Sequence, residues 1–255
     1  MSQKLHNFNA GPSILPNKIF NKTSNAVLNL NKTGLSILEI SHRSNEFKDI
    51  LREARELVLD IAQLDSKEYS SLFLQGGAST QFLMAAYNFL NNNAGYITTG
   101  SWSTKAMQEA KLFGNVIEIA SSKDKNFNYI PKNYNIQDDL DYIHLTTNNT
   151  IYGTQFKHIP DFNEPLIADM SSDIFSRDID YSVFDLFYAG AQKNLGPAGT
   201  TLVVIKKEIL ERVKREIPSM LNYKVHIDKE SSFNTPPVFS IYACLLNLRE
   251  IKISG

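Results

Sequence analysis

The chain has 255 residues, of which 42% are hydrophobic and 21% charged, a balance typical of a folded globular protein that excludes a disordered or fibrous chain. Its 26 basic and 27 acidic side chains leave a net charge of −1, so no broad positive surface for nucleic acid is expected. No apolar run reaches the roughly 18 to 20 residues that span a bilayer, and residues 1–7 hold no apolar signal core. The single cysteine, Cys244, allows no intrachain disulfide and fits a reducing compartment. We therefore expect a cytoplasmic protein with no nucleic-acid or membrane partner.

The first strong pattern follows an opening without regular periodicity. Apolar residues recur at helical spacing over residues 47–64 with charges between them, which predicts an amphipathic helix capped by Ser44 or Asn45. A short apolar run at 71–74, a glycine turn and a second apolar-periodic stretch at 79–90 predict a strand, a turn and a helix.

The same alternation of strands and helices continues along the chain. It predicts a strand near 95–99, then a helix over about 103–113 that stops at Gly114. Further short apolar runs, each bounded by polar residues or glycine, predict strands at 116–119, 142–145, 166–168, 186–189 and 201–205. This order predicts an α/β fold of three layers, in which a mostly parallel sheet is covered by helices on both faces.

The last third of the chain contains fewer strand signals. Residues 206–216 are charged and periodic, which predicts an exposed helix that ends before Pro218. A polar stretch over 224–237 precedes a final apolar helix at about 238–251. No composition shift marks a linker, so residues 1–255 are expected to form one domain.

Ligands of open α/β sheets bind at the carboxyl ends of the strands, so polar residues that follow apolar runs are the candidates for a site. The first candidate is Gln75-Gly-Gly-Ala-Ser-Thr, where glycines allow close approach and Ser79 opens a helix whose free N–H groups suit a phosphate. Taken alone, an ordinary capped turn is the commoner explanation of such a motif.

Two further candidates are an acid and a lysine that each follow a predicted strand. Asp169 ends the run at 166–168, where a buried carboxylate requires a partner, although a turn cap beside Ser171 and Ser172 explains it as well. Lys193 follows the strand at 186–189, and a partly desolvated lysine amine can condense with an aldehyde. A solvated loop lysine is the commoner case when the neighbours are ignored.

The fourth candidate is Trp102, the only tryptophan, whose ring could stack on a heteroaromatic cofactor, though a packing tryptophan is commoner. An anion-binding turn, a stacking ring, an acid for a ring nitrogen and a lysine for an aldehyde are together what pyridoxal 5′-phosphate (PLP) needs. The five histidines have no ligand spacing and no serine lies in a Gly-x-Ser-x-Gly turn, so neither a metal site nor a serine hydrolase is expected.

These segments resemble the phosphoserine aminotransferases, a class V family of the fold-type-I PLP enzymes. The resemblance covers nearly the whole chain and is carried by Asn7-Phe-Asn-Ala-Gly-Pro-Ser, Glu39-Ile-Ser-His-Arg-Ser, Gln75-Gly-Gly-Ala-Ser-Thr, Asp169-Met-Ser-Ser, Tyr188-Ala-Gly-Ala-Gln-Lys-Asn and Phe233-Asn-Thr-Pro-Pro. It implies amino transfer from glutamate to 3-phosphohydroxypyruvate in serine biosynthesis, and a related step in vitamin B6 synthesis. It also implies that residues 1–255 are the family's PLP-binding large domain and that its small C-terminal domain is absent from this chain.

The resemblance also assigns roles to residues of the site. Lys193 matches the lysine that binds the cofactor aldehyde and moves the substrate α-proton, and Asp169 matches the acid that keeps the pyridine nitrogen protonated. Trp102 matches the residue whose ring stacks on the cofactor, and Thr150 matches the residue near the cofactor phenolic oxygen. The residues that match the phosphate neighbours are Ala78, Ser79 and Gln192.

Further matches lie outside these segments. Asn234 and Thr235 match residues that reach the phosphate of a partner subunit, which implies a homodimer with shared sites. His42 and Arg43 match residues that bind substrate anions, and they matter more here because some members carry arginine at the place of Ser79.

Two alternatives to this activity remain open. One is a truncated chain that binds PLP without turnover. The other is a different class V activity, such as alanine–glyoxylate transamination; a desulfurase is disfavoured because Cys244 lies in an apolar helix.

Overall fold

A seven-stranded sheet forms the centre of the computed structural model, which describes residues 5–137 and 139–254. Its strands lie in the order β1-β9-β8-β7-β4-β2-β3. Their bounds are Tyr69–Leu74 (β1), Asn93–Thr98 (β2), Asn115–Ser121 (β3), Tyr142–Thr146 (β4), Leu166–Asp169 (β7), Leu186–Gly190 (β8) and Thr201–Lys206 (β9). Only β9 runs antiparallel to its neighbours, β1 and β8, so the predicted mostly parallel sheet is confirmed.

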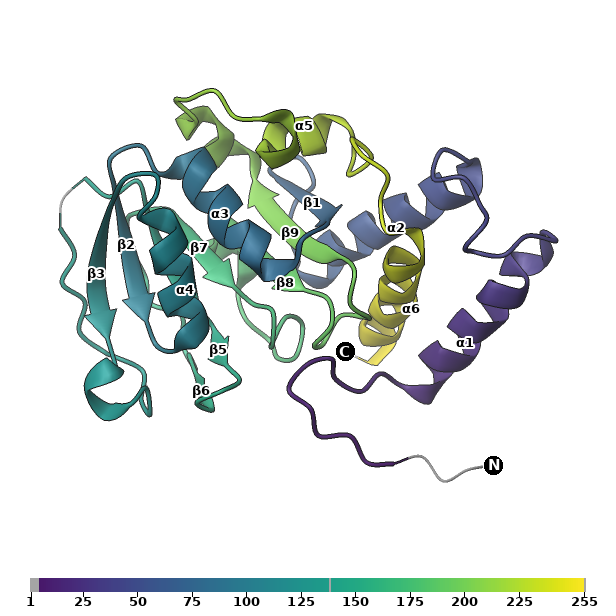
Figure 1. Ribbon diagram of the computed structural model, residues 1–255, viewed down its shortest axis with the longest axis horizontal. Coiled ribbons are helices and arrows are strands. Elements are labelled where there is room, and N and C mark those ends of the chain that lie inside the picture. Colours follow the sequence, from purple (N-terminus) through teal and green to yellow (C-terminus); the bar gives the residue numbers. More distant parts are fainter. Residues whose placement is uncertain (1–4, 138, 255) are drawn as a thin grey trace.

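Helices cover both faces of this sheet (Figure 1). One face carries α3 (Gly77–Phe89), α4 (Ser101–Ala110) and the short α5 (Tyr223–Asp228). The other face carries α2 (Asn45–Ile61) and α6 (Val238–Ser254), and α1 (Asn17–Leu28) packs on the outside of α6. The predicted three layers are therefore present.

The side chains of the central strands are divided between two hydrophobic cores. Along β9, Leu202 and Val204 face the α2–α6 side, whereas Val203 and Ile205 face the α3–α4 side. Successive side chains of a strand point to opposite faces, so a strand covered on both faces must be apolar throughout. Burying each such side chain contributes roughly 1.5–3 kcal/mol. That is why these short runs were recognisable in the sequence.

Most helix predictions agree with the structure, with small differences at the ends. The Ser44 hydroxyl accepts a hydrogen bond from the Phe47 N–H and caps α2 as predicted. The helix predicted at 79–90 begins two residues earlier, because Gly76 adopts a φ of 95° and serves as its N-cap. The last helix extends to Ser254.

Two predictions were wrong, and one further helix lies where no element was predicted. Helix α1 lies in the segment predicted to be irregular; it buries only Ile19, Thr23 and Ala26 and has no side-chain cap. Residues 206–216 form a short 3-10 helix, Lys207–Arg212, rather than a long one. Helix α5 lies partly within the predicted polar stretch, where the Asn222 side chain accepts from the Lys224 N–H.

A small hairpin completes the elements that surround the site. Strand β5 (Asn148–Asn149) pairs antiparallel with β6 (Thr154–Gln155) directly after β4. Its turn carries Thr150.

Candidate active site

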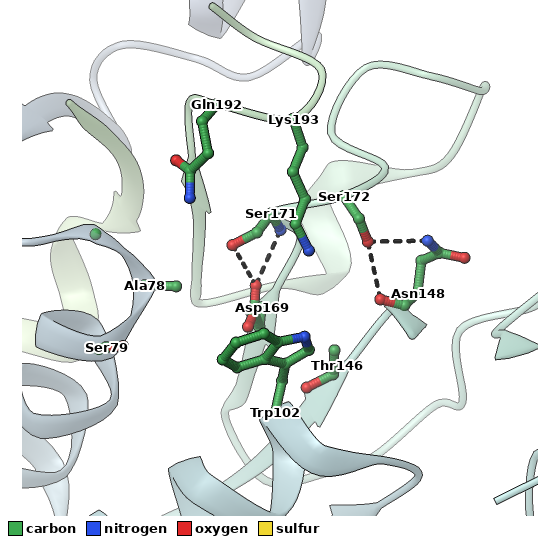
Figure 2. Close-up of a pocket in the computed structure, with 11 residues that line it drawn as sticks. Ala78, Ser79, Trp102, Thr146, Asn148, Asp169, Ser171, Ser172, Gln192 and Lys193 are labelled. Atoms are coloured by element: carbon green, nitrogen blue, oxygen red, sulfur yellow. Dashed lines mark hydrogen bonds between the residues drawn. The ribbon is translucent and has the colours of Figure 1, made fainter. Parts of the chain in front are cut away.

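The carboxyl ends of the parallel strands meet at one cavity of about 150 Å³ (Figure 2). The register places Thr146 of β4 beside Asp169 of β7, and Asp169 beside Tyr188 of β8. Side chains reach the cavity from the first turn of α3, the start of α4, the ends of β4 and β7, and the loop after β8. This is the edge at which the sequence predicted a site.

Asp169 is a buried acid at the base of the cavity, with only 4% of its surface exposed. Its Oδ1 accepts hydrogen bonds from the Ser171 backbone N–H at 2.9 Å and from the Ser171 hydroxyl at 2.6 Å. Burial raises the pKa of the Asp169 carboxyl, and the bonds from Ser171 and the charge of Lys193 act in the opposite direction. A buried carboxylate of this kind is stabilised by a cationic group bound in the cavity.

Lys193 extends into the same cavity from the loop after β8 and is partly buried. Its Nζ lies 3.3 Å from the Thr150 Oγ1 and 5.8 Å from the centre of the Trp102 ring. Burial lowers the pKa of the Lys193 amine, while Asp169 and Asp173 raise it by a smaller amount. A lowered pKa increases the fraction of neutral amine, which is the form that attacks an aldehyde.

The N-terminus of α3 forms another wall of the cavity. Gly77, Ala78 and Ser79 line it, and these first residues of a helix have N–H groups without a partner inside the helix. A Cβ at Gly76 would lie 2.0 Å from the Thr80 hydroxyl, so this turn requires glycine. The free N–H groups and the helix dipole together favour a phosphate.

Two polar atoms at the cavity have no hydrogen-bond partner within the described part of the chain. These atoms are the Trp102 Nε1 and the Thr146 Oγ1, both buried. Unpaired buried polar groups cost free energy, and a bound ligand with polar edges removes that cost. With an acid, an amine, a planar ring and an anion-binding helix terminus around one cavity, the residues present fit PLP.

The cavity brings together most of the residues that the sequence predicted for the cofactor. Those that line it are Ala78, Ser79, Trp102, Asp169, Gln192 and Lys193, and Thr150 contacts the Lys193 amine. Both interpretations of Asp169 apply, since it lines the cavity and also accepts from Ser171 in a turn.

Other predicted residues do not line this cavity. His42 and Arg43 lie in the turn before α2, where the Arg43 N–H bonds to the Ser41 hydroxyl. Asn234 and Thr235 lie beside Gln75 of the same chain: the Asn234 Nδ2 donates to the Gln75 Oε1 at 2.8 Å, and the Gln75 Nε2 donates to the Thr235 carbonyl at 3.1 Å.

Sequence reasoning missed some residues of the cavity. Thr146 and Asn148 line the cavity and follow the strand predicted at 142–145. A search for polar residues directly after each predicted strand would have found them. The Ser172 hydroxyl donates to the Asn148 carbonyl at 2.8 Å and accepts from the Asn148 Nδ2 at 2.9 Å. This pairing joins segments that are distant in sequence.

The described residues contain neither a metal-ligating cluster nor a membrane-spanning helix. Across 5–137 and 139–254, no group of three or more His, Cys, Asp or Glu side chains is placed to hold a metal ion. No helix in these ranges is long and apolar enough to cross a membrane.

The fold and this site define a class of protein, the PLP-dependent aminotransferases. The sequence model of the aminotransferase class-V family matches residues 5–254. The phosphoserine aminotransferase of Flavobacterium johnsoniae is 59% identical over 254 residues, which are 99% of this chain and 71% of that protein. The corresponding enzyme of Bacteroides thetaiotaomicron is 54% identical over 252 residues, with the same coverage.

Solved structures agree with these relatives. The phosphoserine aminotransferase from Bacillus circulans subsp. alkalophilus has a TM-score of 0.92 and 43% identity, over 96% of this chain and 69% of that one. The PLP-bound phosphoserine aminotransferase from Trichomonas vaginalis has a TM-score of 0.93 and 32% identity, over 99% and 72% of the two chains. This chain belongs to the phosphoserine aminotransferase family of the class V aminotransferases, and its cofactor is PLP.

Proposed function

We propose that this chain transfers the amino group of glutamate to 3-phosphohydroxypyruvate, giving O-phosphoserine and 2-oxoglutarate in serine biosynthesis. The observation that carries the proposal is the convergence of Lys193, Asp169 and the α3 N-terminus on one cavity. The 59% identity to a phosphoserine aminotransferase supports this substrate pair. The family resemblance extends the proposal to a related step of vitamin B6 synthesis.

Lys193 is the proposed catalytic base. When bound, PLP supplies an aldehyde for amine exchange and a ring that withdraws electrons from the substrate carbon. The Lys193 amine would hold that aldehyde, and a Lys193 amine released by the substrate amine would move the substrate α-proton. Its lowered pKa favours the neutral form needed for both tasks, and the Thr150 Oγ1 accepts a hydrogen bond from it.

Asp169 is the proposed partner of the pyridine nitrogen. Its carboxylate holds the proton on that nitrogen, and the two bonds from Ser171 keep the Oδ1 atom in place. The buried position strengthens this ion pair because little water competes for the carboxylate.

The other cavity residues position the cofactor. The N–H groups of Ala78 and Ser79 and the Gln192 side chain line the cavity and would bind the phosphate, and the Trp102 ring would stack on the pyridine. His42 and Arg43 are proposed to bind substrate anions; an arginine fork suits a phosphate or a carboxylate.

We also propose a homodimer in which Asn234 and Thr235 serve the phosphate site of the partner. Their position outside the cavity of their own chain supports this assignment. Residues 1–255 are proposed to be the PLP-binding large domain of the family, and a cytoplasmic location remains a prediction.

The alternatives receive less support. Cys244, the single cysteine, is fully buried in α6, and burial raises the pKa of its thiol, which argues against a desulfurase. The names of the relatives favour an active phosphoserine aminotransferase over a chain that only binds PLP.

The direct test incubates the purified, PLP-loaded chain with O-phosphoserine and 2-oxoglutarate and measures the glutamate formed. Unphosphorylated serine is the control donor, and the pair alanine and glyoxylate tests the other class V activity. We expect glutamate with phosphoserine and little with serine. PLP binding without turnover would support the non-catalytic alternative, and turnover of alanine with glyoxylate alone would support the other.

A further inference from the structure

Four residues beyond Asp169 lies a second buried acid, Asp173, which the proposed reaction does not use. Only 5% of its surface is exposed, and each of its partners is a donor. The Thr147 hydroxyl donates to Oδ1, the Gln155 Nε2 donates to Oδ2 at 3.1 Å, and the Arg177 Nη2 lies 3.6 Å from Oδ2. Burial raises the pKa of the Asp173 carboxyl, and these three donors act against burial because each stabilises the ionised form.

The partners of Asp173 lie on both sides of the β5–β6 hairpin. Thr147 directly precedes β5, and Gln155 ends β6. The backbone supports the same connection, since the Thr147 N–H donates to the Asp169 carbonyl at 3.0 Å and the Phe156 N–H donates to the Thr147 carbonyl at 2.9 Å. One carboxylate therefore fixes the two ends of the hairpin against the turn that follows β7.

The turn of this hairpin carries Thr150, whose hydroxyl contacts the Lys193 amine at 3.3 Å. Thr150 has no place in the regular pairing of β5 and β6, so its position depends on how the hairpin is held. Arg177 adds to the support, because its Nη2 also donates to the Phe156 carbonyl at 2.7 Å and its Nη1 to the Lys157 carbonyl at 3.2 Å.

We propose that Asp173 is a positioning residue for Lys193: it anchors the β5–β6 hairpin at both ends and so holds the Thr150 hydroxyl against the Lys193 amine. This inference rests on the proposed function only for the role of Lys193. The anchoring itself is a property of the chain without cofactor.

The charge of Asp173 provides a second connection to Lys193. Asp169 and Asp173 are the carboxylates whose charges raise the pKa of the Lys193 amine against the effect of burial. Replacing Asp173 by a neutral residue removes one of these charges. A residue that only stabilised the fold would leave the titration of Lys193 unchanged.

The test compares Asp173→Asn and Asp173→Ala with a matched control, Asp141→Asn. Asp141 is also an acid that anchors backbone, since its Oδ2 accepts from the N–H groups of Asn91, Asn92 and Asn93, but it lies at the other end of β4. In the chain without PLP, hydrogen exchange of residues 148–155 is measured by mass spectrometry. In PLP-loaded protein, the absorbance of the lysine-bound cofactor is titrated with pH.

We expect hairpin exchange to become about tenfold faster or more in Asp173→Ala, because the hairpin loses its charged anchor. The pH midpoint of the absorbance change, which reports the Lys193 nitrogen bound to the cofactor, should fall in both Asp173 variants, because one nearby negative charge is removed. Asp141→Asn should change neither, even if its thermal stability falls. In the double variant Asp173→Asn with Gln155→Glu, the carboxylate and the amide exchange places, so slow exchange should be partly restored.

Equal exchange and equal titration in Asp173→Ala and Asp141→Asn would overturn the proposal. If the protein does not turn over phosphoserine, the proposed function fails but both readouts still apply. If it does not bind PLP, the exchange measurement alone decides the anchoring role.

Discussion

Gly11 lies directly against the side chain of Lys193. A Cβ added to Gly11 would be 2.9 Å from the Lys193 Cγ and 3.4 Å from its Cε. Two residues later, the Ser13 N–H donates to the Gln192 carbonyl at 2.9 Å, and the Ser13 hydroxyl donates to the Lys193 carbonyl. The segment before α1 therefore packs against both the backbone and the side chain of the lysine.

This contact predicts that Gly11→Ala impairs the reaction of Lys193 with PLP. The added methyl group must displace the aliphatic part of the lysine, and we expect roughly tenfold slower binding of PLP to the lysine, since a small misplacement of a reacting group is costly. The rate is followed by absorbance after PLP is mixed with the cofactor-free chain. Asn7→Ala, in the same segment, is the control; equal rates in both variants would contradict the prediction.

The identity of the reactive lysine is a separate prediction. After borohydride reduction of the PLP-loaded chain, peptide mapping should place the pyridoxyl label on Lys193, because its amine is partly buried and faces the cavity. Lys105 provides a matched control, since its Nζ lies 4.8 Å from the Trp102 ring but outside the residues that line the cavity. Lys105→Ala should keep the label and Lys193→Ala should lose it. A label on another lysine would refute the assignment.

Asp169 should affect turnover more than cofactor binding. Asp169→Asn keeps the shape of the side chain but cannot hold a proton on the pyridine nitrogen, so we expect PLP to remain bound while turnover falls about a hundredfold or more. Ser171→Ala removes the hydroxyl bond to Asp169 and leaves the backbone bond, so its loss should be smaller. Wild-type turnover in Asp169→Asn would rule out that Asp169 keeps the pyridine nitrogen protonated.

At the scale of elements, the central strands β8 and β9 were predictable because they are apolar on both faces. Helix α1 was not, because it packs on the outside of α6 and one of its three buried residues, Thr23, is polar, which interrupts the apolar pattern. Residues 206–216 have the apolar spacing of a long helix, but the structure has only the short 3-10 helix Lys207–Arg212 there, and Ile209 is its one buried residue. Tertiary packing, rather than local pattern, decides such segments.

The site was predictable for a related reason. Asp169 is the last residue of β7 and Lys193 follows β8, and neighbouring parallel strands bring their carboxyl ends to one edge. The anchoring of the β5–β6 hairpin by Asp173 was not predictable, because it depends on hydrogen bonds between side chains that the sequence does not specify. The register between β4 and β7 is what makes these contacts possible.

Strand β4 also carries a buried histidine whose charge state affects stability. His144 is 1% exposed, its Nε2 lies 2.8 Å from the Tyr188 hydroxyl, and its ring stacks on Tyr96 at 5.0 Å. Burial lowers the pKa of His144 from 6.5 to about 3. The folded chain therefore holds a neutral imidazole at a pH where the unfolded chain binds a proton.

The sign of the resulting pH dependence follows from this difference. Well above pH 6.5 neither state is protonated at His144. As the pH falls through 6.5 only the unfolded state binds a proton, so the free energy of unfolding falls with a slope that approaches about 1.4 kcal/mol per pH unit, until the folded group titrates. The raised pKa values of Asp169 and Asp173 act in the opposite direction.

The matched experiment is urea unfolding at pH 6.5 and pH 5.5 for the wild type, His144→Gln and the exposed-site control His158→Gln. Asp169 and Asp173 are present in all three proteins, so their contribution to the pH dependence of stability cancels when the proteins are compared. His144→Gln should lose less stability on acidification than the wild type, and His158→Gln should follow the wild type. The same pH dependence in all three proteins would show that His144 does not set it.

At the scale of the whole molecule, several large apolar side chains before α2 are exposed. Phe8 is 92% exposed, Leu28 79% and Leu38 64%. Single exposed apolar residues are common, but several large ones within one region of the chain are typical of surfaces that another chain covers. This distribution supports the proposed homodimer independently of Asn234 and Thr235.

Shared sites within such a dimer can be tested by mixing two inactive variants. One is Lys193→Ala, which keeps its 234–235 segment, and the other is Asn234→Ala with Thr235→Ala, which keeps Lys193. If each segment serves the partner, a mixed dimer has one intact site, because the lysine of one chain meets the intact segment of the other. Random pairing then restores about a quarter of wild-type activity per total chain.

The contacts of this segment within its own chain make the mixing experiment necessary. Asn234 and Thr235 bond to Gln75, which precedes the glycine turn of the α3 phosphate site, so the double substitution alone could act on either subunit. If the segment serves its own chain, every mixed dimer lacks either the lysine or the segment at each site, and activity stays absent. Proven subunit exchange without recovery would therefore assign the segment to its own cavity, whereas recovery requires that it cross the interface.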